Sequence, residues 1–208
     1  ACRELNLGIN LAKSPYILII DDDALLINDD WVEIAYKNFR NNIAVVWGNI
    51  SSCPDVKEYG EFFIGCAFLT RKDIFQQVGM FDEKFFIYQN ELDITIRLNK
   101  YGYRILGLRK LNVQHPIEEN RSRPIKDPKS LQRDYEFALS NRLLIFWKYY
   151  PYWVSFIASI FHSLRILQTM KDYSYIKYWL KGIKRFFSKL YAVGLTYKDR
   201  MGLKELFQ

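Results

Sequence analysis

Three consecutive carboxylates, Asp21, Asp22 and Asp23, directly follow the mostly aliphatic run Tyr16–Ile20. The run predicts a strand buried on both faces, and consecutive Asp residues disfavour a strand, so it should end there. In an open α/β sheet, ligands bind beyond the carboxyl ends of strands. Three adjacent like charges repel one another unless a cation lies between them. The pattern therefore predicts a divalent metal site, with an acidic turn that caps a following helix as the alternative.

Hydrophobic periodicity indicates the elements that must position these carboxylates. Apolar residues at helical spacing predict helices at 1–14, 29–40, 71–78 and 91–101. Short apolar runs predict strands at 16–20, 43–47, 62–70, 103–108 and 111–113. Residues rich in Pro, Gly and charge predict loops at 51–60 and 118–129.

From Ser130 onward the sequence changes to apolar and aromatic stripes at helical spacing. We therefore expect a catalytic core at 1–128 and a helical extension at 129–208. Within the extension, the apolar stretch Trp153–Leu167 is shorter than the ~20 residues that span a bilayer. Clustered aromatic residues and lysines beside an apolar stripe predict helices that lie on an anionic membrane surface. The alternative is that this face packs on the core or on a second subunit, which would give a homo-oligomer.

Composition limits the partners and the compartment. The 208 residues carry a net charge of +7, which favours an anionic partner. Nucleic acid is disfavoured because the basic residues accompany an apolar helical stripe and no exposed aromatic sheet. The three cysteines, which show no CxxC spacing, indicate reduced thiols in a cytosolic protein. The chain begins without Met or a signal-peptide pattern, so we expect it to be a fragment.

Several stretches together resemble the family-two glycosyltransferases of the GT-A fold, particularly the bacterial rhamnosyltransferase-like members. Residues 21–23 are similar to the family's DxD motif, and residues 3–8 resemble an RN-x-G segment with looser spacing. Residues 65–71 resemble its acceptor-side strand, and residues 78–86 resemble its G-x-F-D-E-x-F-F stretch. Residues 89–94 fall where the family has E-D-x-D-L, and His115 falls where a late metal-ligand histidine is usual.

The resemblance implies an α/β fold with a GT-A-type, Rossmann-like mixed sheet, of which this chain holds the second half, followed by the helical extension. It implies a Mg²⁺ or Mn²⁺ cofactor with the ligands Asp21, Asp23 and His115. It implies donor contacts from Arg3, Asn6, Asp21 and Asp22. It also implies acceptor contacts from Gly65, Asp82 and Asn90.

Glu91 is the expected catalytic base by the same resemblance. Asp93, two residues further on, is placed with it at the catalytic site, where it would orient the acceptor or cap the helix. Here Asn90 and Glu91 replace the family's usual Glu and Asp, so the carboxylate of Glu91 lies about 1.5 Å farther out. The alternative for residues 90–93 is a plain helix N-terminus, where the helix dipole favours acids.

The implied activity is inverting transfer of a sugar from a nucleoside-diphosphate sugar to a polysaccharide or lipid-linked glycan. The implied location is the cytoplasmic face of the inner membrane, as a peripheral protein. Two alternatives remain open at this point. One is a non-catalytic, membrane-associated remnant, and the other is a metal-dependent nucleotidyl or phosphoryl transferase, which also uses aspartates at strand ends.

Overall fold

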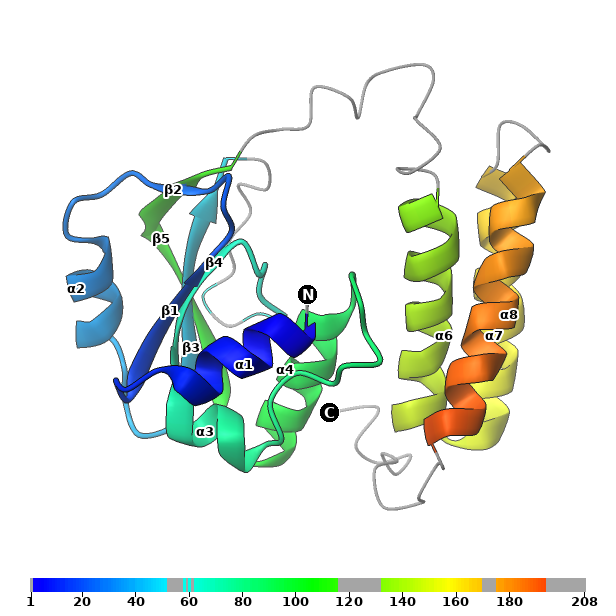
Figure 1. The fold of residues 1–208 in the computed structure, drawn as a ribbon, viewed down its shortest axis with the longest axis horizontal. Helices are drawn as coiled ribbons and strands as arrows, with labels where there is room; N and C mark the ends of the chain where they lie inside the picture. Colours follow the sequence, from blue (N-terminus) through cyan, green and yellow to red (C-terminus); the bar gives the residue numbers. More distant parts are fainter. Residues whose placement is uncertain are drawn as a thin grey trace. The chain divides into compact units, whose positions relative to one another are not determined.

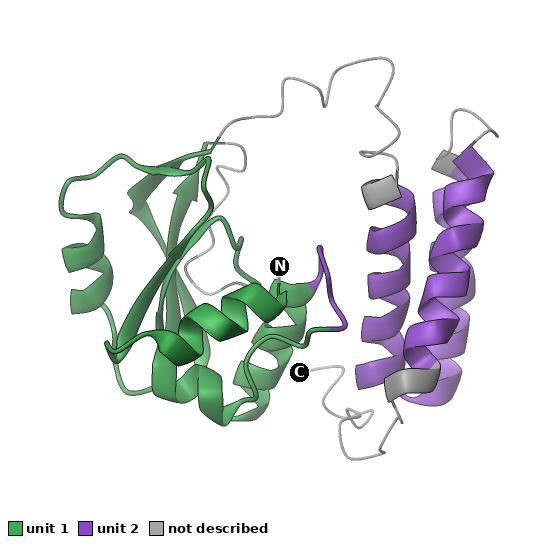
Figure 2. Ribbon diagram, viewed as in Figure 1, with its two compact units in different colours: residues 1–83, 90–124 green, residues 84–89, 125–208 purple. Residues whose placement is uncertain are grey.

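The structure, a computed structural model, describes residues 2–51, 58, 60, 62–115, 132–169 and 175–193. The chain divides into two compact units (Figure 2): a sheet unit of residues 1–83 and 90–124, and a helical unit of residues 84–89 and 125–208. The boundary expected between residues 128 and 129 lies outside the described residues, as does Cys53. The short segment 84–89 belongs to the helical unit, although residues on both sides of it belong to the sheet unit.

The sheet unit is built on a five-stranded mixed sheet (Figure 1). Its strands, in spatial order, are β1 (Tyr16–Ile20), β4 (Ala67–Arg71), β3 (Ile43–Ile50), β5 (Arg104–Gln114) and β2 (Leu25–Leu26). β3 and β5 are parallel, and the other three neighbouring pairs are antiparallel. The expected α/β architecture with a mixed sheet is confirmed.

Four helices accompany this sheet: α1 (Cys2–Leu11), α2 (Trp31–Lys37), α3 (Lys72–Gln77) and α4 (Asn90–Lys100). Figure 1 shows α2 on one side of the sheet and α3 and α4 on the other. Central strand β3 is therefore buried along almost its whole length. α4 buries Ile94 and Leu98, one turn apart, and ends at Lys100; Gly102, two residues later, has a φ of 81°, which suits a glycine after a helix.

Three sequence expectations about strands were wrong in detail. β1 is not buried on both faces: it lies at the edge of the sheet, its residues are half-buried, and Ile20 is 41% exposed. The strand expected at 62–70 begins only at Ala67. Phe63 is nevertheless buried, because its ring packs 4.7 Å from that of Phe68 without strand pairing.

The two short strands expected at 103–108 and 111–113 form the single strand β5. Its register against β3 shifts, because Gly48 pairs with Leu108 while the next residue of β3 pairs with Asn112. A Cβ at Gly48 would collide with the backbone carbonyl of Leu111, so this bulge requires a glycine there.

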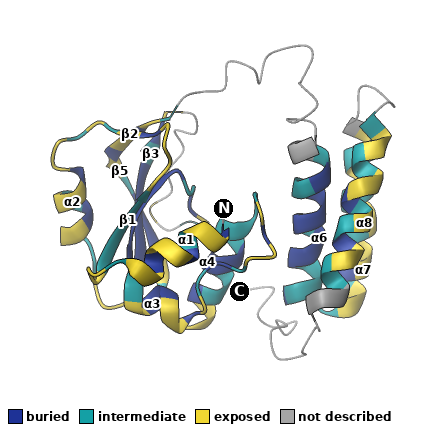
Figure 3. Ribbon diagram, in the orientation of Figure 1, coloured by how far each residue is buried: buried dark blue, intermediate teal, exposed yellow. Residues whose placement is uncertain are grey.

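The helical unit contains a π-helical turn, η2 (Gln132–Phe137), followed by α6 (Ala138–Tyr149), α7 (Tyr152–Thr169) and α8 (Ile176–Val193). α6 contacts both α7 and α8, and its leucines 139, 143 and 144 are buried. Figure 3 shows α6 mostly buried or intermediate, whereas α7 and α8 carry exposed residues along their lengths. Within the described residues, no helix combines the length and apolar character needed to cross a membrane.

Candidate active site

The acidic triplet lies in a tight turn at the end of β1. The backbone N–H of Asp21 donates to the carbonyl of Cys66 (2.8 Å), and the N–H of Ala24 donates back to the carbonyl of Asp21 (3.1 Å). The first bond ties the turn to the start of β4, and the second closes it. All three aspartates are exposed on this turn, beyond the end of the strand.

His115 reaches the same place because two-residue strand β2 pairs with the end of β5. Leu25 lies opposite Gln114, so the residue after Gln114 comes to lie beside the acidic turn. The hydroxyl of Ser51 donates to the carbonyl of His115 (2.8 Å) and accepts from its backbone N–H (3.0 Å). This double contact fixes the backbone that carries the imidazole.

Asp21, Asp23 and His115 form a compact cluster. The His115 Nε2 atom is 3.3 Å from Asp23 Oδ1 and 4.0 Å from Asp21 Oδ2, and one potential ligand atom from each residue lies within 4.8 Å of the others. Burial raises the pKa of Asp21; the charge of His115 opposes this shift, and those of Asp23 and Asp22 add to it. Two carboxylates with one imidazole suit Mn²⁺ or Mg²⁺, so the residues fit a divalent metal.

Cys66 lies beside this cluster but does not extend it. Burial raises the pKa of its thiol to about 12, and the charges of Asp21 and Asp23 act in the same direction. A thiol with so high a pKa stays protonated at neutral pH, whereas metal binding requires the thiolate. We therefore leave Cys66 out of the candidate ligand set.

Glu91 is the second residue of α4, and its carboxylate lies against Gly65. A Cβ at position 65 would overlap Glu91 Oε1, so the absence of a side chain makes room for the carboxylate. Burial raises the pKa of Glu91 to about 6, and the charge of Asp21 adds to the shift, while hydrogen bonds from its own backbone, Asn90 and Gly65 oppose it. The electrostatic influence of Asp21 shows that Glu91 is within range of the metal cluster.

Gly65 and Asn90 therefore both contact the carboxylate of Glu91 in this structure. Gly65 was expected to contact the acceptor from within a strand, but it lies in a turn, and the group that approaches it is the Glu91 carboxylate. The side chain of Asn90 likewise hydrogen-bonds to Glu91. Both residues position the carboxylate that the sequence singled out as the base.

Asp93 is held in an ion pair within the sheet unit. It is completely buried, and its Oδ2 atom accepts from Arg97 Nη2 (2.6 Å) and Nε (3.1 Å). Arg97 in turn donates to the carbonyl of Val78 (2.6 Å), which ties α4 to the end of α3. In this structure the buried carboxylate of Asp93 is ion-paired and helps to hold α4 to α3, and the catalytic role expected of it stays a prediction.

Asn6 is also structural. It is buried, its amide nitrogen donates to the carbonyl of Phe81 (2.8 Å), and its oxygen accepts from the N–H of Phe81 (3.0 Å). This contact orients the segment that carries Asp82, and the donor contact expected from Asn6 stays a prediction. The donor contacts expected from Arg3 and Asp22, both exposed, stay predictions.

Asp82 lies in the same neighbourhood as Glu91. The pKa of the buried Cys2 thiol is raised to about 12, chiefly by burial, and the charges of Glu91 and Asp82 both add to the shift. Both carboxylates therefore lie within electrostatic range of one thiol. The acceptor contact expected from Asp82 stays a prediction.

The sequence reasoning missed a strained turn just before α4, which we call the 88–89 turn. Tyr88 and Gln89 both have a φ of 66°, although neither is a glycine. The amide of buried Asn141 on α6 donates to the carbonyls of Ile87 (2.6 Å) and Tyr88 (2.9 Å), and Lys189 on α8 donates to the Asn141 oxygen. These contacts join residues about fifty positions apart, so local spacing carries no signal of them.

Comparison with solved structures identifies the fold. GalNAc-T7 with UDP, GalNAc and Mn²⁺ aligns with a TM-score of 0.58 at 12% identity, over 94% of this chain and 44% of that chain. The mannosyltransferase PcManGT from Pyrobaculum calidifontis, in complex with GDP-Man and Mn²⁺, aligns with a TM-score of 0.50 at 12% identity, over 70% of this chain and 44% of that chain. No protein-family model and no curated protein matches the sequence. The chain has the GT-A-type glycosyltransferase fold, and it spans less than half the length of either structure.

Proposed function

We propose that this protein is an inverting, metal-dependent glycosyltransferase that uses a nucleoside-diphosphate sugar as donor. One observation carries the proposal: the cluster of Asp21, Asp23 and His115 lies within electrostatic range of a largely buried carboxylate, Glu91, whose pKa is about 6. A cation-binding group and a proton acceptor are the two functions that such a transfer requires. Both solved structures named above belong to sugar transferases with bound Mn²⁺, which supports the same assignment.

Asp21, Asp23 and His115 are the residues that would hold Mg²⁺ or Mn²⁺. When bound, the ion neutralises the negative charge of the departing diphosphate as a Lewis acid. The protein's own contribution here is to hold its ligands: the turn after β1 fixes the aspartates, and Ser51 fixes the backbone of His115.

Glu91 acts as the catalytic base. A carboxylate with a pKa of about 6 is mostly ionised at neutral pH, yet it is more basic than an ordinary Glu. It takes the proton of the acceptor hydroxyl while that oxygen bonds to the anomeric carbon, on the side opposite the diphosphate. The bond from the anomeric carbon to the diphosphate oxygen breaks with its electron pair, so the configuration inverts and the proton stays on Glu91.

The acceptor is a growing polysaccharide or a lipid-linked glycan at the cytoplasmic face of the inner membrane. The resemblance of residues 65–94 to the rhamnosyltransferase-like enzymes supports this acceptor class and the transfer of a rhamnose-like hexose.

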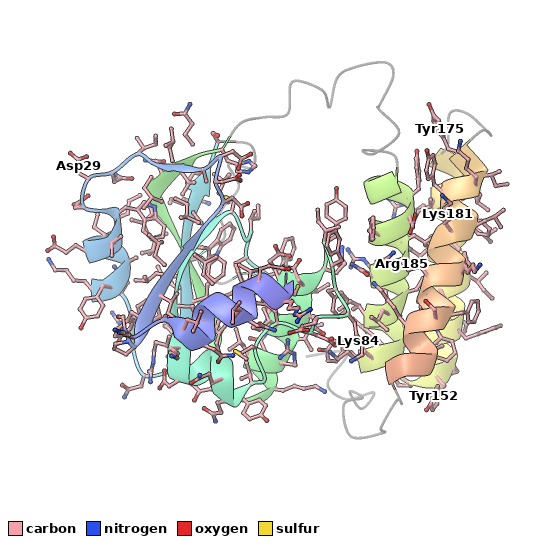
Figure 4. The ribbon with its side chains drawn as sticks, in the orientation of Figure 1. Asp29, Lys84, Tyr152, Tyr175, Lys181 and Arg185 are labelled. Carbon is pink, nitrogen blue, oxygen red and sulfur yellow. The ribbon has the colours of Figure 1, made fainter. Side chains whose placement is uncertain are left out.

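Two measurements test the proposal. Mn²⁺ binding is measured by calorimetry, and release of nucleoside diphosphate is measured with a panel of donor sugars. Asp23→Asn and His115→Ala should weaken Mn²⁺ binding and abolish release, whereas Glu91→Gln should keep Mn²⁺ binding and lose release. Asp29→Asn, which alters an exposed carboxylate before α2 (Figure 4), is the matched control and should change neither.

Two results would overturn the proposal. Tight Mn²⁺ binding without diphosphate release from any donor would indicate a non-catalytic protein. Release of pyrophosphate from nucleoside triphosphates, lost in Asp23→Asn, would indicate nucleotidyl transfer.

A further inference from the structure

The outer face of α7 is apolar from Trp153 to Leu164 and ends in the exposed Arg165. Six large side chains, which we call the α7 stripe, are each between 44% and 70% exposed: Trp153, Phe156, Ile157, Ile160, Phe161 and Leu164. Their alternating spacing of three and one places them on one side of the helix. Scattered apolar side chains are normal on a protein surface, but a contiguous row of this kind marks an interaction site.

Two serines of α7 point the other way, toward α6. The hydroxyl of buried Ser155 donates to the carbonyls of Phe146 (2.7 Å) and Tyr150 (3.1 Å). The hydroxyl of Ser159 accepts from the indole N–H of Trp147 (3.0 Å). α7 therefore buries small hydroxyl-bearing residues inside the unit and leaves its bulky apolar residues outside, which reverses the pattern of a water-facing helix.

Positive charge accompanies this surface. The sequences of α7 and α8 contain no Asp or Glu, and three lysines of α8 are exposed: Lys177, Lys181 and Lys184. Helix α8 also carries exposed apolar residues, among them Leu180 and Phe187. Figure 4 shows Lys181 and Arg185 on α8; Arg185 is paired with Glu136 (3.2 Å), so the three lysines are the better candidates for an external anion.

We propose that the α7 stripe and the α8 lysines dock on an anionic lipid bilayer, with α7 lying in the plane of the interface. Large apolar side chains with lysines beside them are the composition that binds acidic lipid headgroups and the adjoining acyl chains. Charge argues against a second copy as the occupant, because a symmetric contact through this face would bring the two sets of lysines together without any acidic residue of α7 or α8. The proposal is independent of the proposed catalysis.

Vesicle flotation of the protein tests the proposal. Vesicles of phosphatidylcholine with phosphatidylglycerol should bind the protein, and vesicles of phosphatidylcholine alone should bind it much more weakly. Changing Lys177, Lys181 and Lys184 to Gln should weaken binding by about fivefold per lysine, or about a hundredfold together. Raising the salt from about 0.1 M to about 1 M should weaken binding of the original protein as well, because the screening length falls from about 10 Å to about 3 Å.

The apolar contribution is tested by a second variant. Phe156→Ser with Phe161→Ser should reduce binding by about tenfold or more per residue, because each exposed ring would lose its burial in the lipid. Leu7→Ser with Leu11→Ser, which alters two exposed leucines of α1, is the matched control and should bind as the original does. For the lysine variant, the control removes an equal charge from the sheet unit, at exposed residues Lys13, Arg40 and Lys110.

Three results would overturn the proposal. One is failure to float with anionic vesicles at low salt, and another is equal loss of binding in the lysine variant and its charge control. The third is a concentration-dependent dimer that Phe156→Ser with Phe161→Ser converts to monomer without any change in flotation, which would identify a second copy as the occupant. Transfer activity enters none of these readouts, so failure of the catalytic proposal would leave this test intact.

Discussion

Replacing Glu91 by Gln should stabilise the fold while abolishing transfer. The carboxylate is largely buried, and its pKa is about 6 against an ordinary value of 4.5. The folded protein therefore binds this proton more tightly than the unfolded chain does. The stability that this tighter proton binding contributes is fully present below pH 4.5 and is lost as the pH rises through 6. Above pH 6 the ionised carboxylate therefore destabilises the folded state.

The size of the effect follows from the shift in the pKa. A difference of about 1.5 units corresponds to about 2 kcal/mol at 1.36 kcal/mol per unit. This value is an upper bound, because the residue is partly exposed and solvent screens its charge. Glu91→Gln should thus raise the free energy of unfolding by up to ~2 kcal/mol at pH 7 and above, and by far less below pH 4.5.

Urea denaturation from pH 4 to pH 8, in the presence of EDTA, measures this difference. Glu58→Gln removes an exposed carboxylate of the same unit and serves as the control. Equal stability of Glu91→Gln and the original protein at pH 8, or a difference that does not change with pH, would refute the reasoning. That result would mean that the carboxylate is well solvated and that its pKa is not raised. Glu91 would then no longer qualify as a base of raised pKa.

Three further substitutions distinguish residues that position the Glu91 carboxylate from residues that stabilise the fold. Gly65→Ala should displace the carboxylate that lies over Gly65 and lower transfer by tenfold or more without changing Mn²⁺ affinity, whereas Gly8→Ala, where a Cβ meets open space, should not. Asp93→Ala should cost about 3–5 kcal/mol in urea denaturation because it removes one partner of a buried ion pair, whereas Asp73→Ala in an exposed pair should cost at most ~1 kcal/mol. Asn141→Ala should speed hydrogen exchange in residues 84–89 and lower transfer, and glycines at both positions of the 88–89 turn should restore both.

The sequence identified the members of the metal cluster but not the way in which they meet. Residue types predicted a metal site at the acidic triplet, and the family resemblance named Asp21, Asp23 and His115 as its ligands. Their meeting depends on a two-residue strand, β2, and on the hydroxyl of Ser51, which lies 64 positions before His115. Neither feature has a periodic signal, because two residues are too few to show alternation and a single Ser hydroxyl has many ordinary uses.

The differences between expectation and structure have a common physical source. An aliphatic run such as Tyr16–Ile20 has the same appearance in a central strand and in an edge strand, and only the number of neighbours decides its burial. Asn6 and Asp93 are polar residues near functional motifs, so they were expected to contact substrate. Both are buried instead, with partners 75 and 4 positions away that satisfy their polar atoms. Polar residues that fix a loop and those that bind a ligand cannot be separated without knowing burial.

The 88–89 turn belongs to the helical unit and is followed directly in the sequence by α4, which carries Glu91. Two consecutive non-glycine residues at positive φ cost on the order of 1–3 kcal/mol each, so such a turn persists only where other contacts hold it. Asn141 and Lys189 supply those contacts from α6 and α8, and the chain passes from the turn directly into Asn90 at the start of α4. Asn90 hydrogen-bonds to the carboxylate of Glu91. Contacts from α6 and α8 thus hold the turn that directly precedes α4 in the chain, and Asn141→Ala should alter turnover more than metal binding.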